Sequence, residues 1–286
     1  MNDPNVQNVE IVVDDFVSTL INLLQGGISI STIIDIGSGD GQFGLHCLLF
    51  KRDLHVLNID ANHIFESSLR EIKDKLGIPY RILALSNHHG TLTMSNSSSE
   101  NPYGFGVNNN TEDNDRKQYI DCTTLDSLLG DYNFPEPYFI KMDVEDAEFA
   151  ILQGSEKTLS KTAAILMEQH VQPGKSTGDF NDRFNYLAGR NFSLFDIKEI
   201  HYQKRNLNLK TVNIKIGNDS NPEVLSVFHP VFINDKYDFR KVKDQQKDQS
   251  KQAYEIMANE QALNNRRLKV IELNRKLITQ LRVTQN

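Results

Sequence analysis

The chain has 286 residues, of which 38% are hydrophobic and 24% charged, which is typical of a globular protein. Its formal net charge of −7 disfavours general nucleic-acid binding and attachment to anionic membranes. Two cysteines are too few for a disulfide framework or a zinc cluster. No secretory signal is visible, and no apolar run approaches the about 20 residues that span a bilayer, so we expect a cytoplasmic protein without a transmembrane segment.

The predicted elements begin with an amphipathic helix over residues 9–25 and then alternate between strands and helices. Strands are predicted at 32–36, 55–60, 80–85, 91–94, 119–122, 138–144, 163–170, 192–200 and 224–233. Helices are predicted at 43–50, 64–76, 123–129, 147–159 and 179–188. This alternation indicates an α/β fold, and we predict a Rossmann-like, doubly wound, mostly parallel sheet of seven strands.

Two segments depart from the alternation. Residues 95–117 are mostly Ser, Asn, Asp, Gly and Glu, and we expect either a substrate lid or a disordered insertion there. After residue 236, apolar residues recur every seven positions, which indicates a long C-terminal helix that forms a coiled coil, docks on a partner subunit or folds back on the body. The predicted division is therefore an N-terminal helical segment (1–30), a central domain (31–235) and a helical tail (236–286).

A glycine-rich loop, Asp35-Ile36-Gly37-Ser38-Gly39-Asp40-Gly41, follows the first predicted strand and opens a helix. Its spacing departs from the dinucleotide fingerprint, and no Lys-Ser/Thr follows, which excludes a phosphate-binding P-loop. Asp60 ends the second strand, where a carboxylate can accept from both hydroxyls of a ribose. Asp35 suits a ligand with an amino group, so the loop looks like the S-adenosylmethionine site of Rossmann-like methyltransferases. A nicotinamide dinucleotide and a tight turn without ligand are the alternatives.

A second charged stretch, Ile140-Lys141-Met142-Asp143-Val144-Glu145, reads as a buried strand that ends in acids. At period two, Lys141, Asp143 and Glu145 share one face of the strand. Charged groups are costly to bury without partners. Helix-forming residues follow at once, so the acids are predicted at the carboxyl edge of the sheet, where ligands bind in open α/β folds.

Several segments together resemble the FkbM family of S-adenosylmethionine-dependent methyltransferases. They are Ile34-Asp35-Ile36-Gly37, Ala84-Leu85-Ser86-Asn87 with Gly90-Thr91-Leu92, Thr124-Leu125-Asp126-Ser127-Leu128, Ile140-Lys141-Met142-Asp143-Val144-Glu145 with Ala147-Glu148, and Met167-Glu168-Gln169-His170. The resemblance spans roughly residues 30 to 172. It implies methyl transfer to oxygen, often on sugars, glycans or glycosylated natural products, and identifies the central domain as a methyltransferase domain. Cofactor-binding residues on this view are Asp35, Gly37, Ser38, Gly39, Asp60, Ala61, Ser86 and Asn87.

The sequence departs from the family pattern at three places. Asp146 stands where the family usually has Gly, which puts the placement of the preceding acids in question. Asp60-Ala61-Asn62 replaces the common Glu-Pro-x, which keeps the acid for the ribose. The glycine loop has the general Gly-Ser-Gly-Asp-Gly form rather than the family's Gly-Ala-Asn form.

Methyl transfer to a hydroxyl benefits from a general base or a Lewis acid. His170 is the first choice for the base, because its ordinary pKa suits neutral pH; a structural histidine is the alternative. Glu168 and His170 share one strand face, and their polar ends should meet Asp143 and Glu145 if the two strands are neighbours. Those acids could orient the substrate or hold Mg²⁺ together with Glu168.

The remaining charged candidates have structural interpretations. Lys141 is expected to neutralise the acids rather than react. His88 and His89 are interpreted as turn residues, and His201 and His229 as isolated structural histidines.

The sequence therefore predicts an O-methyltransferase that acts on a sugar, glycan or glycoconjugate. The alternative is a scaffold protein with this fold that docks through its C-terminal helix, as a homo-oligomer or on another partner, without catalysis. A nicotinamide-dependent oxidoreductase is disfavoured by the glycine spacing and by the missing Tyr-x-x-x-Lys motif.

Overall fold

The computed structural model describes residues 15–96, 105–107, 117–145, 147–170, 180–204 and 223–238. The predicted C-terminal helix, Asp146 and much of the 95–117 segment lie outside these ranges. Within them, no helix combines the length and the apolar character needed to cross a bilayer.

A mixed sheet forms the centre of the fold, in the order β10-β12-β9-β8-β1-β2-β3 with β11 paired to β12. β1, β2, β3, β8 and β9 are parallel, whereas β12 is antiparallel to β9. The strands are β1 Thr32–Ile36, β2 His55–Asp60, β3 Tyr80–Ile82, β8 Tyr138–Met142, β9 Thr162–Met167, β10 Gln169–His170, β11 Phe192–Lys204 and β12 Glu223–Asn234. The predicted α/β architecture is confirmed.

The prediction of seven strands was wrong by one, because the strand expected at 163–170 is split at Glu168. The backbone N–H of Glu168 donates to Met142 O at 2.9 Å, across to the neighbouring strand. Both pieces still pair with β12, through Leu166 in β9 and Gln169 in β10.

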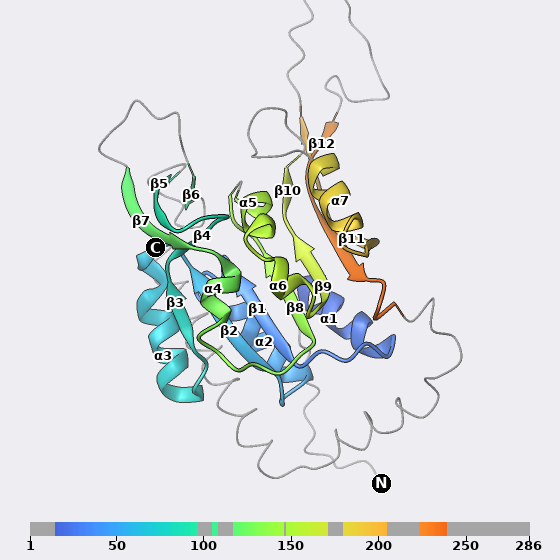
Figure 1. The fold of residues 1–286 in the computed structure, drawn as a ribbon, viewed down its shortest axis with the longest axis horizontal. Helices are drawn as coiled ribbons and strands as arrows, with labels where there is room; N and C mark the ends of the chain where they lie inside the picture. Colours follow the sequence, from blue (N-terminus) through green and yellow to red (C-terminus); the bar gives the residue numbers. More distant parts are fainter. Residues whose placement is uncertain are drawn as a thin grey trace, which may run out of the picture.

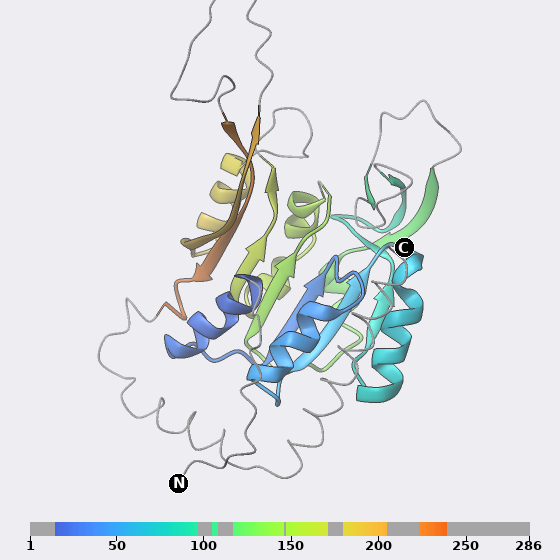
Figure 2. The same ribbon diagram turned by 180° about the vertical axis from the view of Figure 1, so that it is seen from behind.

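Helices cover both faces of the sheet, as Figures 1 and 2 show from opposite sides. One face carries α1 Asp15–Gln25, α2 Gln42–Phe50, η1 His63–Phe65 and α3 Glu66–Leu76. The other carries α4 Leu125–Leu129, α5 Glu148–Gln153, α6 Glu156–Leu159 and α7 Phe180–Ala188. Successive strand residues enter opposite cores: Ile33 and Phe139 join the α1–α3 side, and Ile34 and Ile140 the other. Burial on both faces explains the continuous apolar runs of these strands.

The single helix predicted over 147–159 was also wrong, because it breaks at Gly154 and Ser155 into α5 and α6. Asp126 accepts from the backbone N–H groups of Lys157 and Thr158, both at 2.8 Å, which satisfies donors at the start of α6. A side chain at Gly154 would overlap the carbonyl oxygen of Ser86. The break therefore follows from tertiary contacts rather than from local propensity.

A second sheet with the order β4-β7-β5-β6 lies beside the carboxyl ends of the central strands, at the upper left of Figure 1. Its strands are β4 Ala84–Leu85, β5 Gly90–Asn96, β6 Phe105–Val107 and β7 Gln118–Thr123. Of the two alternatives for residues 95–117, a fully disordered insertion does not hold at β6, where buried Phe105 packs with Met94 and Ile120. A side chain at Gly106 would overlap Glu145, so β6 lies directly against the predicted site.

Candidate active site

The predicted charged residues lie on one face of the central sheet, toward its carboxyl edge. The strand register aligns Asp35 of β1 with Lys141 of β8 on one side and with Asn58 of β2 on the other. Asp35 and Lys141 each lie two residues after a residue of the α1–α3 core, Ile33 and Phe139. Since side chains alternate along a strand, the polar row continues that core face to the edge.

Lys141 is the central cation of this face and is only 5% exposed. Its Nζ donates to Gly37 O at 2.8 Å and lies 3.4 Å from both Asp35 Oδ1 and Asp143 Oδ2. Burial alone would lower the pKa of Lys141, but Asp143 and Asp35 outweigh it and raise the pKa above its ordinary value. Lys141 therefore stays charged and links the glycine loop to the two acids.

Asp35 has no exposed surface. Burial raises the pKa of its carboxyl group, and the positive charge of Lys141 offsets part of that rise. Neither carboxylate oxygen has a hydrogen-bond partner among the described residues. Because Asp35 is enclosed, its effect on a ligand would be electrostatic, through Lys141 and the loop, rather than by direct contact.

The glycine loop is attached to both neighbouring strands. The N–H groups of Gly37 and Ser38 donate to Ile59 O at 2.9 and 3.1 Å, at the end of β2. Gly37 has φ +70°, and a side chain there would collide with the carbonyl oxygen of Asp143. Gly39, with φ +54°, donates its N–H to Asp60 Oδ2 at 2.7 Å. Glycine is required at Gly37 by backbone conformation and by space together.

Asp60 ends β2 with its side chain held in place and 9% of its surface exposed. Its two carboxylate oxygens accept from the N–H groups of Gly39 (2.7 Å) and Asn62 (2.8 Å). Burial raises the pKa of Asp60 to about 6, and the two hydrogen bonds offset only part of that rise. Each oxygen retains a lone pair, so the carboxylate fits the role of acceptor for ribose hydroxyls.

The other predicted cofactor residues are Ser38 in this loop and Ala61, Ser86 and Asn87, which follow β2 and β4. Ser38 is 7% exposed, and its Oγ has no hydrogen-bond partner in the described part of the chain. Ala61 packs partly against the core of the second sheet. Ser86 donates its N–H to Thr123 O at 2.9 Å, whereas the side-chain amide of Asn87 donates to Gln153 Oε1 at 2.9 Å. Asn87 therefore ties the end of β4 to α5.

The acids and His170 converge as expected, because β8 and β9 are adjacent. His170 Nε2 lies 3.3 Å from Glu168 Oε2 and 3.7 Å from Glu145 Oε2. This geometry places a group that accepts and releases protons next to two carboxylates.

The interpretation of His229 as isolated was wrong. It lies on β12, two residues before Val231, and one of its ring nitrogens comes within 4.8 Å of carboxylate oxygens of Asp143 and Glu168. The ring is buried and packs on Phe16 of α1 with centroids 4.7 Å apart. The available sequence signal was the period of two with Val231, but the sequence does not show that β12 pairs with β9.

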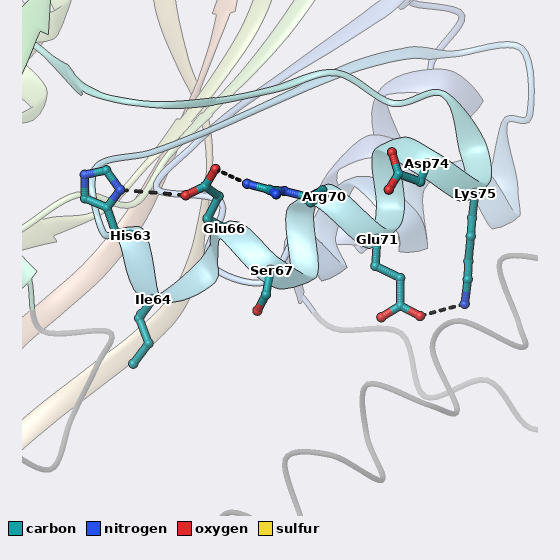
Figure 3. Close-up of a pocket in the computed structure, with 8 residues that line it drawn as sticks. All are labelled: His63, Ile64, Glu66, Ser67, Arg70, Glu71, Asp74 and Lys75. Atoms are coloured by element: carbon teal, nitrogen blue, oxygen red, sulfur yellow. Dashed lines mark hydrogen bonds and ion pairs between the residues drawn. The ribbon is translucent and has the colours of Figure 1, made fainter.

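A separate hollow runs along the outer surface of η1 and α3 (Figure 3). It is lined by His63, Ile64, Glu66, Ser67, Arg70, Glu71, Asp74 and Lys75. Its ion pairs follow the helix, with Arg70 to Glu66 at 2.7 Å and Lys75 to Glu71 at 2.6 Å. Such pairs between exposed side chains on one helix face contribute little to stability, because water screens them. None of the predicted site residues lines this hollow, and we interpret it as helix surface.

The model of the methyltransferase FkbM domain matches residues 35–194, which is more than half of the chain. The chain belongs to the FkbM methyltransferase family. The matched range begins at Asp35 and contains the glycine loop, Asp60, Lys141, the acids and His170. Membership of this methyltransferase family identifies S-adenosylmethionine as the methyl donor. His229 lies outside the matched range.

No curated protein matches this FkbM chain. Among solved structures, a proposed RNA methyltransferase from Pyrococcus horikoshii is 11% identical, with coverage of 77% of this chain and 81% of that one and a TM-score of 0.40. The precorrin-6y C5,15-methyltransferase of Geobacter metallireducens has 8% identity, coverage of 75% and 87%, and a TM-score of 0.39. An S-adenosylmethionine-dependent methyltransferase from Clostridium acetobutylicum has 8% identity, coverage of 77% and 89%, and a TM-score of 0.38.

Proposed function

We propose that the protein is an S-adenosylmethionine-dependent O-methyltransferase that modifies a hydroxyl of a sugar, glycan or glycoconjugate. The observation that carries the proposal is the cluster of His170, Glu168 and Glu145 at the same sheet edge as Asp60. A neutral sugar hydroxyl must lose its proton as it is methylated, so the site needs an acceptor for that proton. The acceptor class itself rests on the family resemblance.

The residues divide into two groups on this proposal. Asp60 accepts from the ribose hydroxyls, and the glycine loop lets the cofactor approach the backbone closely. When bound, the cofactor supplies a methyl group already activated by a positively charged sulfur. His170 takes the proton from the hydroxyl, and Glu168 and Glu145 stabilise the imidazolium that results. Lys141 keeps the glycine loop fixed against β8. Holding the reacting oxygen in line supplies much of the acceleration.

Cofactor binding is tested by calorimetry with S-adenosylmethionine and S-adenosylhomocysteine. Asp60→Ala should weaken both affinities by about tenfold or more, since it removes charge-assisted hydrogen bonds worth about 1.5–3 kcal/mol. His55 is exposed at the opposite, amino end of β2, so His55→Ala should bind normally. Absence of binding in the unmodified protein would reject the cofactor.

Methyl transfer is tested with methyl-labelled cofactor, free sugars, nucleotide sugars and a glycan extract. Label recovered as a methyl ether would support transfer to a hydroxyl, whereas label found only on nitrogen or in carboxylate esters would reject transfer to a hydroxyl. His170→Ala should lower turnover by about 10²- to 10⁴-fold with little change in cofactor affinity. Full turnover in that variant would remove His170 as the base.

A further inference from the structure

We propose that Asp143, Glu168 and His229 form a binding site for a divalent transition-metal ion next to the cofactor loop. One ligand atom from each residue lies within 4.8 Å of the other two. Ligands on opposite sides of one ion are about 4 Å apart, so small side-chain rotations would close the site. The three residues come from β8, β9 and β12, or from the positions just beyond those strands, and share one face of the sheet.

His229 is the observation that points to a ligand. Only 5% of its surface is exposed, and Nδ1 has no hydrogen-bond partner among the described residues. Glu199 Oε2 lies 3.9 Å from Nδ1, which is too far for a hydrogen bond. The buried ring also brings one of its nitrogens within 4.8 Å of a carboxylate oxygen of Asp143 and of Glu168. A buried imidazole beside carboxylates is a common metal ligand.

The carboxylates keep oxygens available for a cation. Asp143 Oδ2 lies 3.4 Å from Lys141 Nζ, and Glu168 Oε2 lies 3.3 Å from His170 Nε2. One oxygen of each carboxylate lies within 4.8 Å of the other two ligand atoms, so both residues can offer a ligand to one ion. Asp35, Asp60 and Glu145 lie at the same edge of the sheet. Their negative charge exceeds the single positive charge of Lys141, which favours the binding of a further cation.

The ligand set selects the kind of metal. The sequence analysis considered Mg²⁺ held by carboxylate oxygens as one possible role of the acids, but both close triads in the described residues include a histidine. Imidazole with two carboxylates suits Mn²⁺ or Zn²⁺ better than Mg²⁺, which prefers oxygen ligands and retains its waters. Three protein ligands leave coordination positions open, as in catalytic metal sites.

The role of the ion rests on the proposed function. An ion held by these residues would make a bound acceptor hydroxyl more acidic. Its proton passes to His170, the oxygen–methyl bond forms, the methyl–sulfur bond breaks, and S-adenosylhomocysteine leaves. Metal binding itself does not depend on this role.

The test is calorimetric and electron-paramagnetic titration of the chelator-treated full chain with Mn²⁺ alone, repeated with Zn²⁺. We expect one saturable site and a higher unfolding temperature with metal. His229→Gln and Glu168→Gln should each weaken Mn²⁺ binding by more than about tenfold, since even the loss of an outer-sphere partner costs that much. His55→Gln, at the opposite edge, should leave it unchanged.

Absence of saturable binding, or equal binding by the His229→Gln, Glu168→Gln and unmodified proteins, would overturn the proposal. Each variant is also titrated with S-adenosylhomocysteine, which shows that it is folded. If the cofactor binds but Mn²⁺ and Zn²⁺ do not, the metal site fails and the proposed function stands. If the metal binds but the cofactor does not, the proposed function fails and the metal site stands.

Discussion

Gly37 and Gly77 show two different reasons why a position requires glycine, which are backbone conformation and lack of space for a side chain. Both have φ +70°, but a side chain at Gly37 would meet Asp143 O and Val144, whereas nothing lies within 4 Å of one at Gly77. Gly77→Ala should therefore cost about 1 kcal/mol of unfolding free energy, from backbone conformation alone. Gly37→Ala should cost about 3 kcal/mol, because overpacking is added. Chemical denaturation measures both, and equal costs would contradict the predicted collision.

Asp60 should make cofactor binding depend on pH. Its folded pKa of about 6 lies above the ordinary 3.8, so the folded protein takes up a proton there as pH falls through about 6. A protonated carboxyl loses acceptor capacity, so S-adenosylhomocysteine should bind about tenfold more weakly at about pH 5 than at about pH 7. Calorimetry across this range checks the slope, which Asp60→Asn should flatten. Tighter binding at low pH would contradict the role of Asp60.

The same shift affects stability, with the sign fixed by linkage. Between about pH 4 and pH 6 the folded state binds more protons at Asp60 than the unfolded state does. Its contribution therefore becomes less favourable as pH rises through that window, because an ionised carboxylate must then be kept buried.

At the scale of elements, one buried ion pair joins α7, α5 and β10. Arg183 and Glu148 are each 1% exposed and lie 3.1 Å apart, and Arg183 Nη1 also donates to Gln169 Oε1 at 2.8 Å. The side-chain amide of Gln169 donates in turn to His170 O at 2.7 Å. This network holds Gln169 and the carbonyl group of His170, the proposed base.

Arg183→Met should destabilise the protein by about 3–5 kcal/mol, because Glu148 would remain buried without its cation. Adding Glu148→Leu should recover most of the loss. Arg190→Met breaks the more exposed pair with Glu156 and should cost less than about 1 kcal/mol. Unfolding midpoints in denaturant measure all three. Similar costs for the two arginine variants would show that burial does not decide the effect.

The sequence was sufficient where local periodicity carries the information. The period of two at Lys141 and Asp143, and at Glu168 and His170, led to the convergence that the structure shows. The sequence-based predictions failed where contacts between distant residues decide the local structure. β6 has only three residues and depends on pairing with β5, while the break at Gly154 depends on Asp126. The pairing of β12 with β9, and thus the place of His229, has no local signal at all.

At the scale of the whole molecule, the net charge is −7, and the candidate site is negative as well. Lys141 faces two carboxylates there, those of Asp35 and Asp143. S-adenosylmethionine carries a positive sulfur that S-adenosylhomocysteine lacks. Raising NaCl from about 0.05 M to about 0.5 M should therefore weaken binding of the methyl donor about threefold and of the product less. Calorimetry at both concentrations tests this, and equal salt dependence would show that this edge does not act on the sulfur.

The antiparallel insertion of β12 between β9 and β10 on one side and β11 on the other has a consequence for biosynthesis. A chain emerging from the ribosome can form β1, β2 and β8 early, but residue 229 reaches the site only after most of the chain has been made. Such long-range pairing is slow because a large loop must close first. The glycine loop should therefore form before His229 joins the cluster. In a nascent chain, the acids of the cluster would lie together before His229 reaches them.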